Sequence, residues 1–269
     1  MKYLFEDWNK LEKKLEGKNI FLFLDYDGTL TPIVEHPDRA LISLEARELI
    51  RRLSKTPKCR LAIISGRSLK DLKRMVGIEK IIYAGNHGLE IEGPKIRFES
   101  PISAGARGAM KQVKSDLEKK LSKVNGVLVE DKGLTLSVHY RQADEDDIPL
   151  IKNIFISNTQ PYVTRRKIRI TSGKKVFEVR PAAKWDKGKV VLWLLAREQF
   201  ASVAENLVPI YIGDDKTDED AFKVIKDNGL TIFVGKLRKS SAKYYLKSTA
   251  EVINFLKRFR IMNLEKVKV

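Results

Sequence analysis

The chain has 269 residues, enough for one large domain or two modest ones with a substantial hydrophobic core. It contains no run of about 18 uninterrupted apolar residues, and its first residues lack a secretory signal, so we expect a cytoplasmic protein with no membrane partner. The single cysteine, Cys59, excludes an internal disulfide and is expected to be buried. The formal net charge of +17 is scattered among nearly as many acidic residues, so it does not by itself indicate a nucleic-acid partner.

Strand-like and helix-like segments alternate in residues 1–100 at the spacing of βαβ units, which predicts a parallel sheet. The expected elements, in chain order, are a strand at 20–24, a helix that Ser43 caps and Pro57 closes, a strand at 61–64, a short helix between Ser68 and Gly77, a strand at 81–84, and a hairpin at 89–98. The apolar strands are expected to be covered on both faces.

The pattern changes near Ser100, where short strands begin to alternate polar and apolar residues, as in an open sheet with one wet face. The expected elements are a helix at 104–123, strands at 127–130 and 134–140, a helix at 144–157, and strands at 167–171 and 175–180. Residues 101–181 therefore read as a separate α+β unit that interrupts the first domain.

The βαβ rhythm resumes after residue 182. The expected elements are a helix at 187–200, a strand at 209–212, a helix that Thr217 caps, a strand at 230–234, and a final helix at 249–260. The predicted fold class is α/β: a Rossmann-like parallel-sheet core, formed by residues 1–100 and 182–269, with an inserted α+β domain at 101–181.

Carboxylates follow two of the predicted strands directly. Asp25 and Asp27 come after the first strand, and Asp214, Asp215 and Asp218 come after the strand at 209–212. Parallel sheets bind ligands at the carboxyl ends of their strands, and a divalent cation is the simplest partner for carboxylates buried there. Such a site can supply a nucleophile and a proton shuttle. The alternatives are an Asp-rich turn after the first strand and acids favoured at a helix N-terminus after the second.

Four motifs, taken together, resemble those of the haloacid dehalogenase-like phosphotransferase superfamily: Asp25-x-Asp27-Gly28-Thr29, Ser65, Lys187 and Gly213-Asp214-Asp215-x-x-Asp218. The resemblance implies that Asp25 attacks phosphorus and that Asp27 acts first as an acid and then as a base. It further implies that Ser65 and Lys187 hold the phosphoryl group. The implied cofactor is Mg²⁺, with Asp25, Asp27, Asp214, Asp215 and Asp218 as the metal residues.

Longer stretches resemble the trehalose-6-phosphate phosphatase family, including the segments 25–33, 85–90, 139–141, 177–181 and 213–222. This resemblance implies Mg²⁺-dependent hydrolysis of trehalose 6-phosphate, a small-molecule sugar phosphate, with the inserted unit as a cap that grips the sugar. The implied substrate-binding residues are Thr29, Gly66, Arg67, His87, Gly88, Glu130, Lys132, Arg141, Lys174 and Glu178.

Other functions stay open at this point. A phosphatase acting on mannosyl-3-phosphoglycerate, glucosylglycerate phosphate or sucrose-6-phosphate would share the same core chemistry, and a phosphomutase would need a bound bisphosphate. A non-catalytic nucleic-acid-binding protein on this fold would account for the positive charge, but sequence-independent binding prefers a continuous basic face, so no nucleic acid is expected. The basic segment 164–169 has no assigned role.

Overall fold

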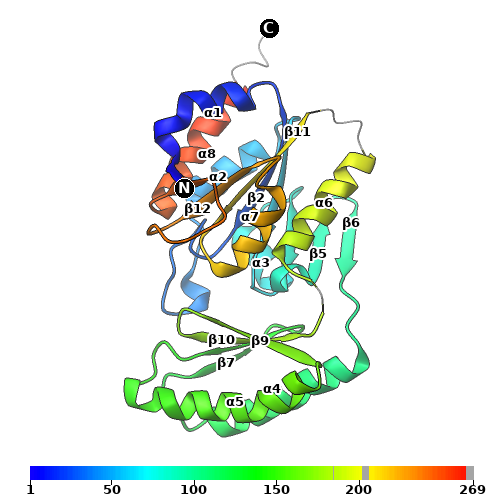
Figure 1. Ribbon diagram of the computed structural model, residues 1–269, viewed down its shortest axis with the longest axis vertical. Helices are drawn as coiled ribbons and strands as arrows, with labels where there is room; N and C mark the ends of the chain where they lie inside the picture. The colour runs from blue at the N-terminus through cyan, green and yellow to red at the C-terminus, as the bar shows by residue number, and fades with distance from the viewer. Residues whose placement is uncertain (184, 202–205, 265–269) are drawn as a thin grey trace. The chain divides into compact units, whose positions relative to one another are not determined.

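The computed structural model describes residues 1–183, 185–201 and 206–264 (Figure 1). The chain divides into two compact units, the core unit, Met1–Phe98 with Trp185–Val269, and the inserted unit, Glu99–Lys184. No helix among the described residues has the length and apolarity needed to cross a membrane.

A nine-stranded sheet forms the centre of the core unit, in the order β1-β13-β12-β11-β2-β3-β4-β5-β6. In this order, every neighbouring pair of strands from β1 through β4 is parallel, whereas β5 pairs with β4 in the antiparallel direction. The strands are β1 (Lys2–Tyr3), β2 (Asn19–Asp25), β3 (Cys59–Ile64), β4 (Ile82–Gly85), β5 (Glu90–Gly93), β6 (Ile96–Glu99), β11 (Leu207–Gly213), β12 (Leu230–Val234) and β13 (Tyr244–Leu246).

Helices cover both faces of this sheet (Figure 1). Successive residues of β2 alternate between two hydrophobic clusters, because side chains along a strand point to opposite faces. Leu22 and Leu24 pack in one cluster, and Phe21 and Phe23 pack in the other. The first cluster includes α1 (Trp8–Leu15), α2 (Leu44–Leu53), α3 (Leu69–Val76) and α8 (Thr249–Leu264), and the second includes α6 (Lys187–Ala201) and α7 (Glu219–Ile225).

The inserted unit is a four-stranded antiparallel sheet with two helices packed on one face (Figure 1). Its elements are α4 (Ala104–Leu121), β7 (Leu128–Asp131), β8 (Leu136–His139), α5 (Ile148–Thr164), β9 (Ile168–Gly173) and β10 (Val176–Pro181), with strand order β7-β8-β10-β9. Val113 and Leu117 of α4 and Phe155 of α5 pack against Val138 and Val179 of the sheet. The other face is left for polar side chains.

Most of the predicted elements are confirmed, including the α/β class. Ser43 and Ser68 each accept a backbone hydrogen bond as N-cap residues, and Cys59 is buried. The prediction that Thr217 caps a helix is wrong: it lies inside the short 3-10 helix Lys216–Asp218, which Asp215 caps through reciprocal bonds with Asp218. Helix α5 ends at Thr164, beyond the predicted residue 157, because its hydrogen bonds continue past Pro161.

Candidate active site

Asp25 is the last residue of β2 and lies at the carboxyl edge of the core sheet, where it is buried. Its Oδ1 accepts a hydrogen bond from Lys187 Nζ at 2.7 Å, while its Oδ2 is buried with no partner among the described residues. Thr29 Oγ1 is also buried and unpartnered within the part of the chain that the structure describes. Unsatisfied buried polar atoms are costly, so their presence in one loop indicates the place of a ligand.

Lys187 begins α6 and bridges two buried carboxylates. Its Nζ also donates to Asp218 Oδ1 at 2.7 Å, and Tyr211 Oη donates to the same oxygen at 2.7 Å. The second oxygen, Asp218 Oδ2, accepts the backbone N–H of Asp215 at 2.9 Å. Both oxygens of Asp218 are therefore engaged, which fixes the position of Lys187 against Asp25.

Burial dominates the electrostatics of this cluster. It raises the pKa of the Asp25 carboxyl well above its ordinary value; Lys187 opposes the rise, and Asp218 and Asp214 add to it. Burial also opposes the charge on Lys187, but the carboxylates of Asp218 and Asp25 outweigh it and raise the pKa of that ammonium group. Burial, followed by the charges of Asp218 and Asp25, raises the pKa of Tyr211 well above its usual value, so its hydroxyl stays a donor.

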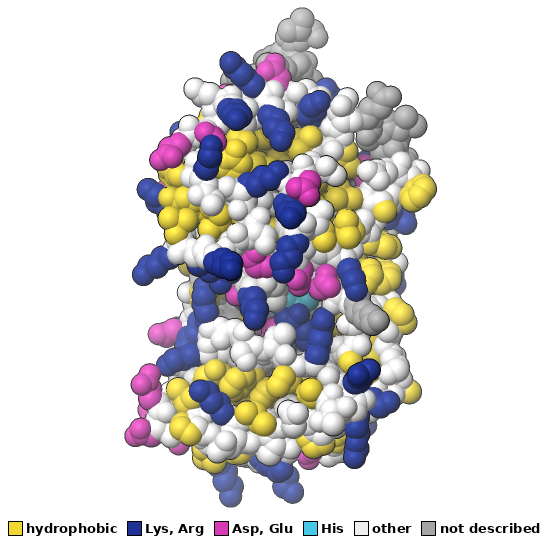
Figure 2. Space-filling view, viewed as in Figure 1, with side chains coloured by type: hydrophobic (Ala, Val, Ile, Leu, Met, Phe, Trp, Pro, Cys, Tyr) yellow, Lys and Arg dark blue, Asp and Glu magenta, His cyan; other side chains and the backbone are white. Residues whose placement is uncertain are grey.

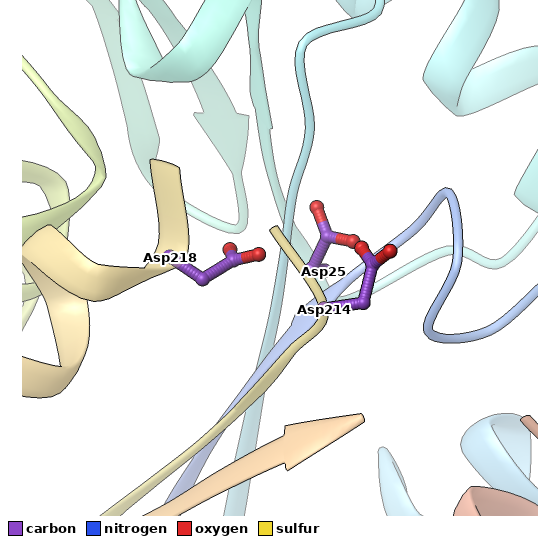
Figure 3. Close-up of side chains that lie close together, drawn as sticks. All are labelled: Asp25, Asp214 and Asp218. Atoms are coloured by element: carbon purple, nitrogen blue, oxygen red, sulfur yellow. The ribbon is translucent and has the colours of Figure 1, made fainter. Parts of the chain in front are cut away.

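Three carboxylates are close enough to share one cation. Asp25, Asp214 and Asp218 each offer an oxygen, and these oxygens all lie within 4.8 Å of one another. Figure 3 shows the Asp25 and Asp214 carboxylates next to each other, with the Asp218 carboxylate directed toward them. This cluster fits Mg²⁺, which prefers oxygen ligands. Three acids face a single lysine, so a further cation would balance their charge, and Asp25 Oδ2 has no other partner among the described residues. Asp215 is half-buried and lies outside this cluster of three.

Gly28 allows the Asp214 carboxylate to approach the backbone of the first loop. Gly28 has φ +86°, and a Cβ added there would lie 2.1 Å from Asp214 Oδ2. We expect Gly28→Ala to displace this carboxylate and to weaken Mg²⁺ binding at least about tenfold, as loss of ligand orientation does at metal sites. Isothermal titration of the protein with Mg²⁺ measures the effect.

Gly17→Ala is the matched control for Gly28→Ala. Gly17 has φ +70°, and an added Cβ would have no atom within 4 Å, so this variant carries the same kind of backbone strain without the clash. It should bind Mg²⁺ as the unmodified protein does. Equal affinity in the two variants would remove Asp214 from the metal site.

Asp27 is held by Arg67. Arg67 Nε and Nη2 donate to the two oxygens of Asp27 at 2.8 and 2.7 Å, and Nη2 also donates to the Pro37 carbonyl at 2.9 Å. A bidentate pair of this kind fixes the plane of the carboxylate. The side chain of Asp27 is 39% exposed, so it stays open to solvent on one side. Arg67, predicted to bind substrate, thus contacts the predicted acid–base directly.

Two further loops end at the same edge of the sheet. Ser65 is buried after β3, and its Oγ accepts the backbone N–H of Arg67 at 3.2 Å; Gly66 between them is half-buried. After β4, the segment 86–88 has positive φ throughout, and an added Cβ at Gly88 would lie 1.9 Å from Val190 Cγ2. His87 is buried in this segment, whose backbone is tied to Ser65 by a 2.8 Å hydrogen bond from His87 N. The predicted Ser65, Gly66, His87 and Gly88 are thereby brought into neighbouring loops.

The inserted unit brings three of its predicted residues, Glu130, Lys132 and Glu178, together on the sheet face opposite its helices. Glu130, Ser137, Glu178 and Thr171 stand in one row across β7, β8, β10 and β9, because they are direct partners in the strand register. Lys132 Nζ lies 3.7 Å from Glu130 and 3.8 Å from Glu178. This row presents positive and negative side chains that can donate hydrogen bonds to hydroxyl groups and accept hydrogen bonds from them.

Two side chains that were not predicted as site residues, His139 and Arg180, extend the row. His139 Nε2 lies 2.7 Å from Glu130 Oε2, and Arg180 donates to Glu178. Of the other two predicted residues of this unit, Arg141 donates from Nη2 to the backbone carbonyl of Lys174 at 2.9 Å.

Sequence reasoning missed Tyr211 and Arg180. Tyr211 lies in the predicted strand at 209–212 and precedes Asp214 by three residues, and a buried tyrosine needs a hydrogen-bond partner for its hydroxyl. That was the available signal. Arg180 occupies a polar-facing position of β10 directly after Glu178 and Val179, which the alternation of this strand indicates.

Comparisons with known proteins identify relatives of the chain. Residues 23–250 match a family model described as trehalose-phosphatase. The chain is 38% identical to trehalose-phosphate phosphatase B of Arabidopsis thaliana over 263 residues, which is 93% of this chain and 69% of the relative. It is also 38% identical to trehalose-phosphate phosphatase of Mycobacterium bovis over 242 residues, covering 88% of this chain and 60% of the relative.

Solved structures show the same fold. The C-terminal domain of Candida albicans trehalose-6-phosphate phosphatase superposes with a TM-score of 0.81 at 24% identity, covering 96% of this chain and 97% of that one. A haloacid dehalogenase-like hydrolase from Bacteroides thetaiotaomicron superposes with a TM-score of 0.62 at 17% identity, covering 90% of this chain and 100% of that one.

Proposed function

Because the chain belongs to the trehalose-phosphatase family, we propose that it hydrolyses trehalose 6-phosphate to trehalose and inorganic phosphate through an aspartyl-phosphate intermediate. One observation supports the mechanism above all others. Asp25 is buried at the sheet edge with one oxygen held by Lys187 and the other unpartnered among the described residues. A carboxylate with one fixed and one free oxygen is positioned to attack an electrophile.

Asp25 Oδ2 forms a bond to phosphorus as the bond from phosphorus to the sugar oxygen breaks. Asp27 gives its proton to the departing sugar oxygen, so neutral trehalose leaves. Water then attacks the phosphorus of the aspartyl phosphate and gives a proton to Asp27, and the bond from phosphorus to Asp25 breaks. Both residues return to their starting states, and one water molecule is consumed.

The neighbouring side chains position these two acids and the phosphoryl group. Lys187 holds Asp25 and stays charged, so it also offsets the charge of a phosphoryl oxygen. Ser65 and Thr29 offer hydroxyl groups in the adjoining loops. Arg67 keeps the Asp27 carboxylate oriented through its two hydrogen bonds.

Mg²⁺ is the proposed cofactor. Asp25 and Asp214 would hold it with the backbone carbonyl of Asp27. Asp218 and Asp215 would position these ligands, with the Asp215 backbone N–H donating to Asp218 Oδ2. When bound, Mg²⁺ would offset the repulsion between the Asp25 carboxylate and the phosphoryl oxygens.

We propose that the inserted unit supplies the sugar-binding groups, with Glu130, Lys132, Arg141, Lys174 and Glu178 as its contacts and His87, Gly88 and Gly66 as contacts from the core unit. Carboxylates accept hydrogen bonds from sugar hydroxyls, and Lys and Arg donate to them. The mixed row around Glu178 and Lys132 offers both kinds of group.

Glu178→Ala is expected to lower kcat/KM for trehalose 6-phosphate at least about tenfold while changing that for a small aryl phosphate by less than about twofold, because the proposed role of Glu178 is to bind the sugar, which the aryl phosphate lacks. Steady-state kinetics on both substrates measure the difference. Glu145→Ala, which removes an exposed acid of the inserted unit, is the control. Equal losses on the two substrates would remove Glu178 from sugar recognition.

A panel of sugar phosphates assayed with Mg²⁺ tests the proposed substrate. Trehalose 6-phosphate should give the highest kcat/KM, ahead of sucrose-6-phosphate, mannosyl-3-phosphoglycerate and glucosylglycerate phosphate. A higher kcat/KM for any of the other three would overturn the assignment of trehalose 6-phosphate as the substrate. No tight nucleic-acid complex is expected, because the 52 Lys and Arg residues are interspersed along the chain with 35 Asp and Glu residues. Figure 2 shows side chains of both charges on one face. A salt-sensitive gel shift without turnover would contradict the proposal as a whole.

A further inference from the structure

Three lysines line a cavity at the edge of the core sheet opposite the Asp25 carboxylate. The cavity is bordered by the first residues of β11, β12 and β13, near Val208, Leu230 and Tyr244. These strands are parallel, and Asp214 follows the last residue of β11. The run from Val208 to Asp214 spans about 20 Å at the rise of an extended strand. The cavity is therefore separate from the candidate active site.

The floor of this cavity is apolar. Leu11 and Leu15 of α1 and Leu230 of β12 line it and are buried. Gly229 also lines the cavity. It packs closely on β11, since an added Cβ there would lie 2.5 Å from the Pro209 carbonyl oxygen. The cavity of about 210 Å³ exceeds the roughly 150 Å³ that suffices for a benzene ring in an apolar protein cavity. It has room for a compact one- or two-ring body.

The rim of the cavity is positively charged without compensation from the described acids. Lys10, Lys14 and Lys243 are exposed at the rim, and no described carboxylate forms an ion pair with any of them. Asp7, which accepts a hydrogen bond from Tyr244 Oη at 3.3 Å, pairs with Lys2 at 3.7 Å instead. The rim therefore attracts an anionic group.

Repulsion between these lysines destabilises helix α1. Lys10 and Lys14 are four residues apart on one helix, where like charges face each other and destabilise it. Lys243, the residue before β13, adds a third positive charge. An anion at the rim would relieve the repulsion among all three. We propose that this cavity binds a small amphipathic anion, with one carboxylate or sulfonate on the lysines and a compact apolar ring body on the leucines.

Calorimetric titration with 2-naphthoate tests the proposal, with neutral 2-naphthylmethanol as the uncharged analogue. The protein should bind 2-naphthoate saturably at one site. The triple variant Lys10→Gln, Lys14→Gln and Lys243→Gln should lose at least about tenfold in affinity. The matched control is Lys13→Gln, Lys119→Gln and Lys226→Gln, which removes the same charge at exposed lysines outside the cavity. It should bind within about twofold of the unmodified protein.

A second variant tests the apolar floor. Val208→Phe places a ring in the cavity and should abolish 2-naphthoate binding while thermal unfolding shows an intact fold. Equal affinities in the two triple variants, no saturable binding at millimolar 2-naphthoate, or tighter binding of 2-naphthylmethanol would each overturn the proposal. So would competition by trehalose 6-phosphate. Binding is measured without Mg²⁺ and in Asp25→Asn, so its outcome does not depend on the proposed hydrolysis.

Discussion

Replacing Asp25 with Asn is expected to lower kcat for trehalose 6-phosphate by at least about a thousandfold, because the amide cannot attack phosphorus in place of the carboxylate. The fold should survive, since the amide keeps the volume of the side chain and Lys187 still pairs with Asp218. Steady-state kinetics with thermal unfolding of the same samples separate the two effects.

Asp227→Asn is the matched control, because Asp227 is exposed and lies outside the cluster of three carboxylates. It should turn over substrate as the unmodified protein does. Activity of Asp25→Asn within tenfold of the unmodified protein would exclude nucleophilic attack from this position, provided that mass spectrometry shows no deamidation back to Asp.

Lys187→Met is expected to damage both stability and catalysis. It leaves the buried carboxylates of Asp25 and Asp218 without their shared cation, and removing one partner of a buried pair costs about 3 to 5 kcal/mol of unfolding free energy. Urea unfolding measures the loss. Catalysis should fall at least about a hundredfold, because Asp25 loses the group that orients it. Lys189→Met, at an exposed position of the same helix, should change neither quantity appreciably.

The double variant Asp25→Asn with Lys187→Met should lose less unfolding free energy than the two single variants lose together, because neutralising Asp25 removes one of the two carboxylate charges left unpaired by Lys187→Met. Additive losses of unfolding free energy would show that Lys187 does not interact with Asp25 in solution.

The main architecture could be predicted because its signals are local. The strands at the centre of the core sheet are continuous apolar runs, and serine caps mark the starts of α2 and α3. Strands β1 and β13 were missed because two or three residues carry no periodicity, and only pairing with each other and β12 makes them strands. Helix α1 was missed although Trp8, Leu11 and Leu15 have helical spacing.

The site could be predicted as a set of loops but not as a set of contacts. Strand order places Asp25, Ser65 and Asp214 at one edge, which follows from parallel pairing alone. That Arg67 pairs with Asp27 rather than standing free for phosphate depends on side-chain packing between segments 40 residues apart. The same holds for Asp215, which sequence spacing cannot distinguish from Asp218, whereas the three-dimensional cluster includes Asp218 alone of the two.

Trapping of the phosphorylated protein tests nucleophilic attack by Asp25 most directly. In Asp27→Asn, p-nitrophenyl phosphate should still phosphorylate the protein, because its leaving group needs no proton, while hydrolysis lacks its base. After an acid quench with Mg²⁺ present, borohydride reduces an aspartyl phosphate to homoserine with release of phosphate, and peptide mass spectrometry should find that homoserine at position 25. Chelation of Mg²⁺ before mixing should prevent its formation. A burst of nitrophenolate with no modified residue at position 25, or turnover that chelators leave unchanged, would contradict the mechanism.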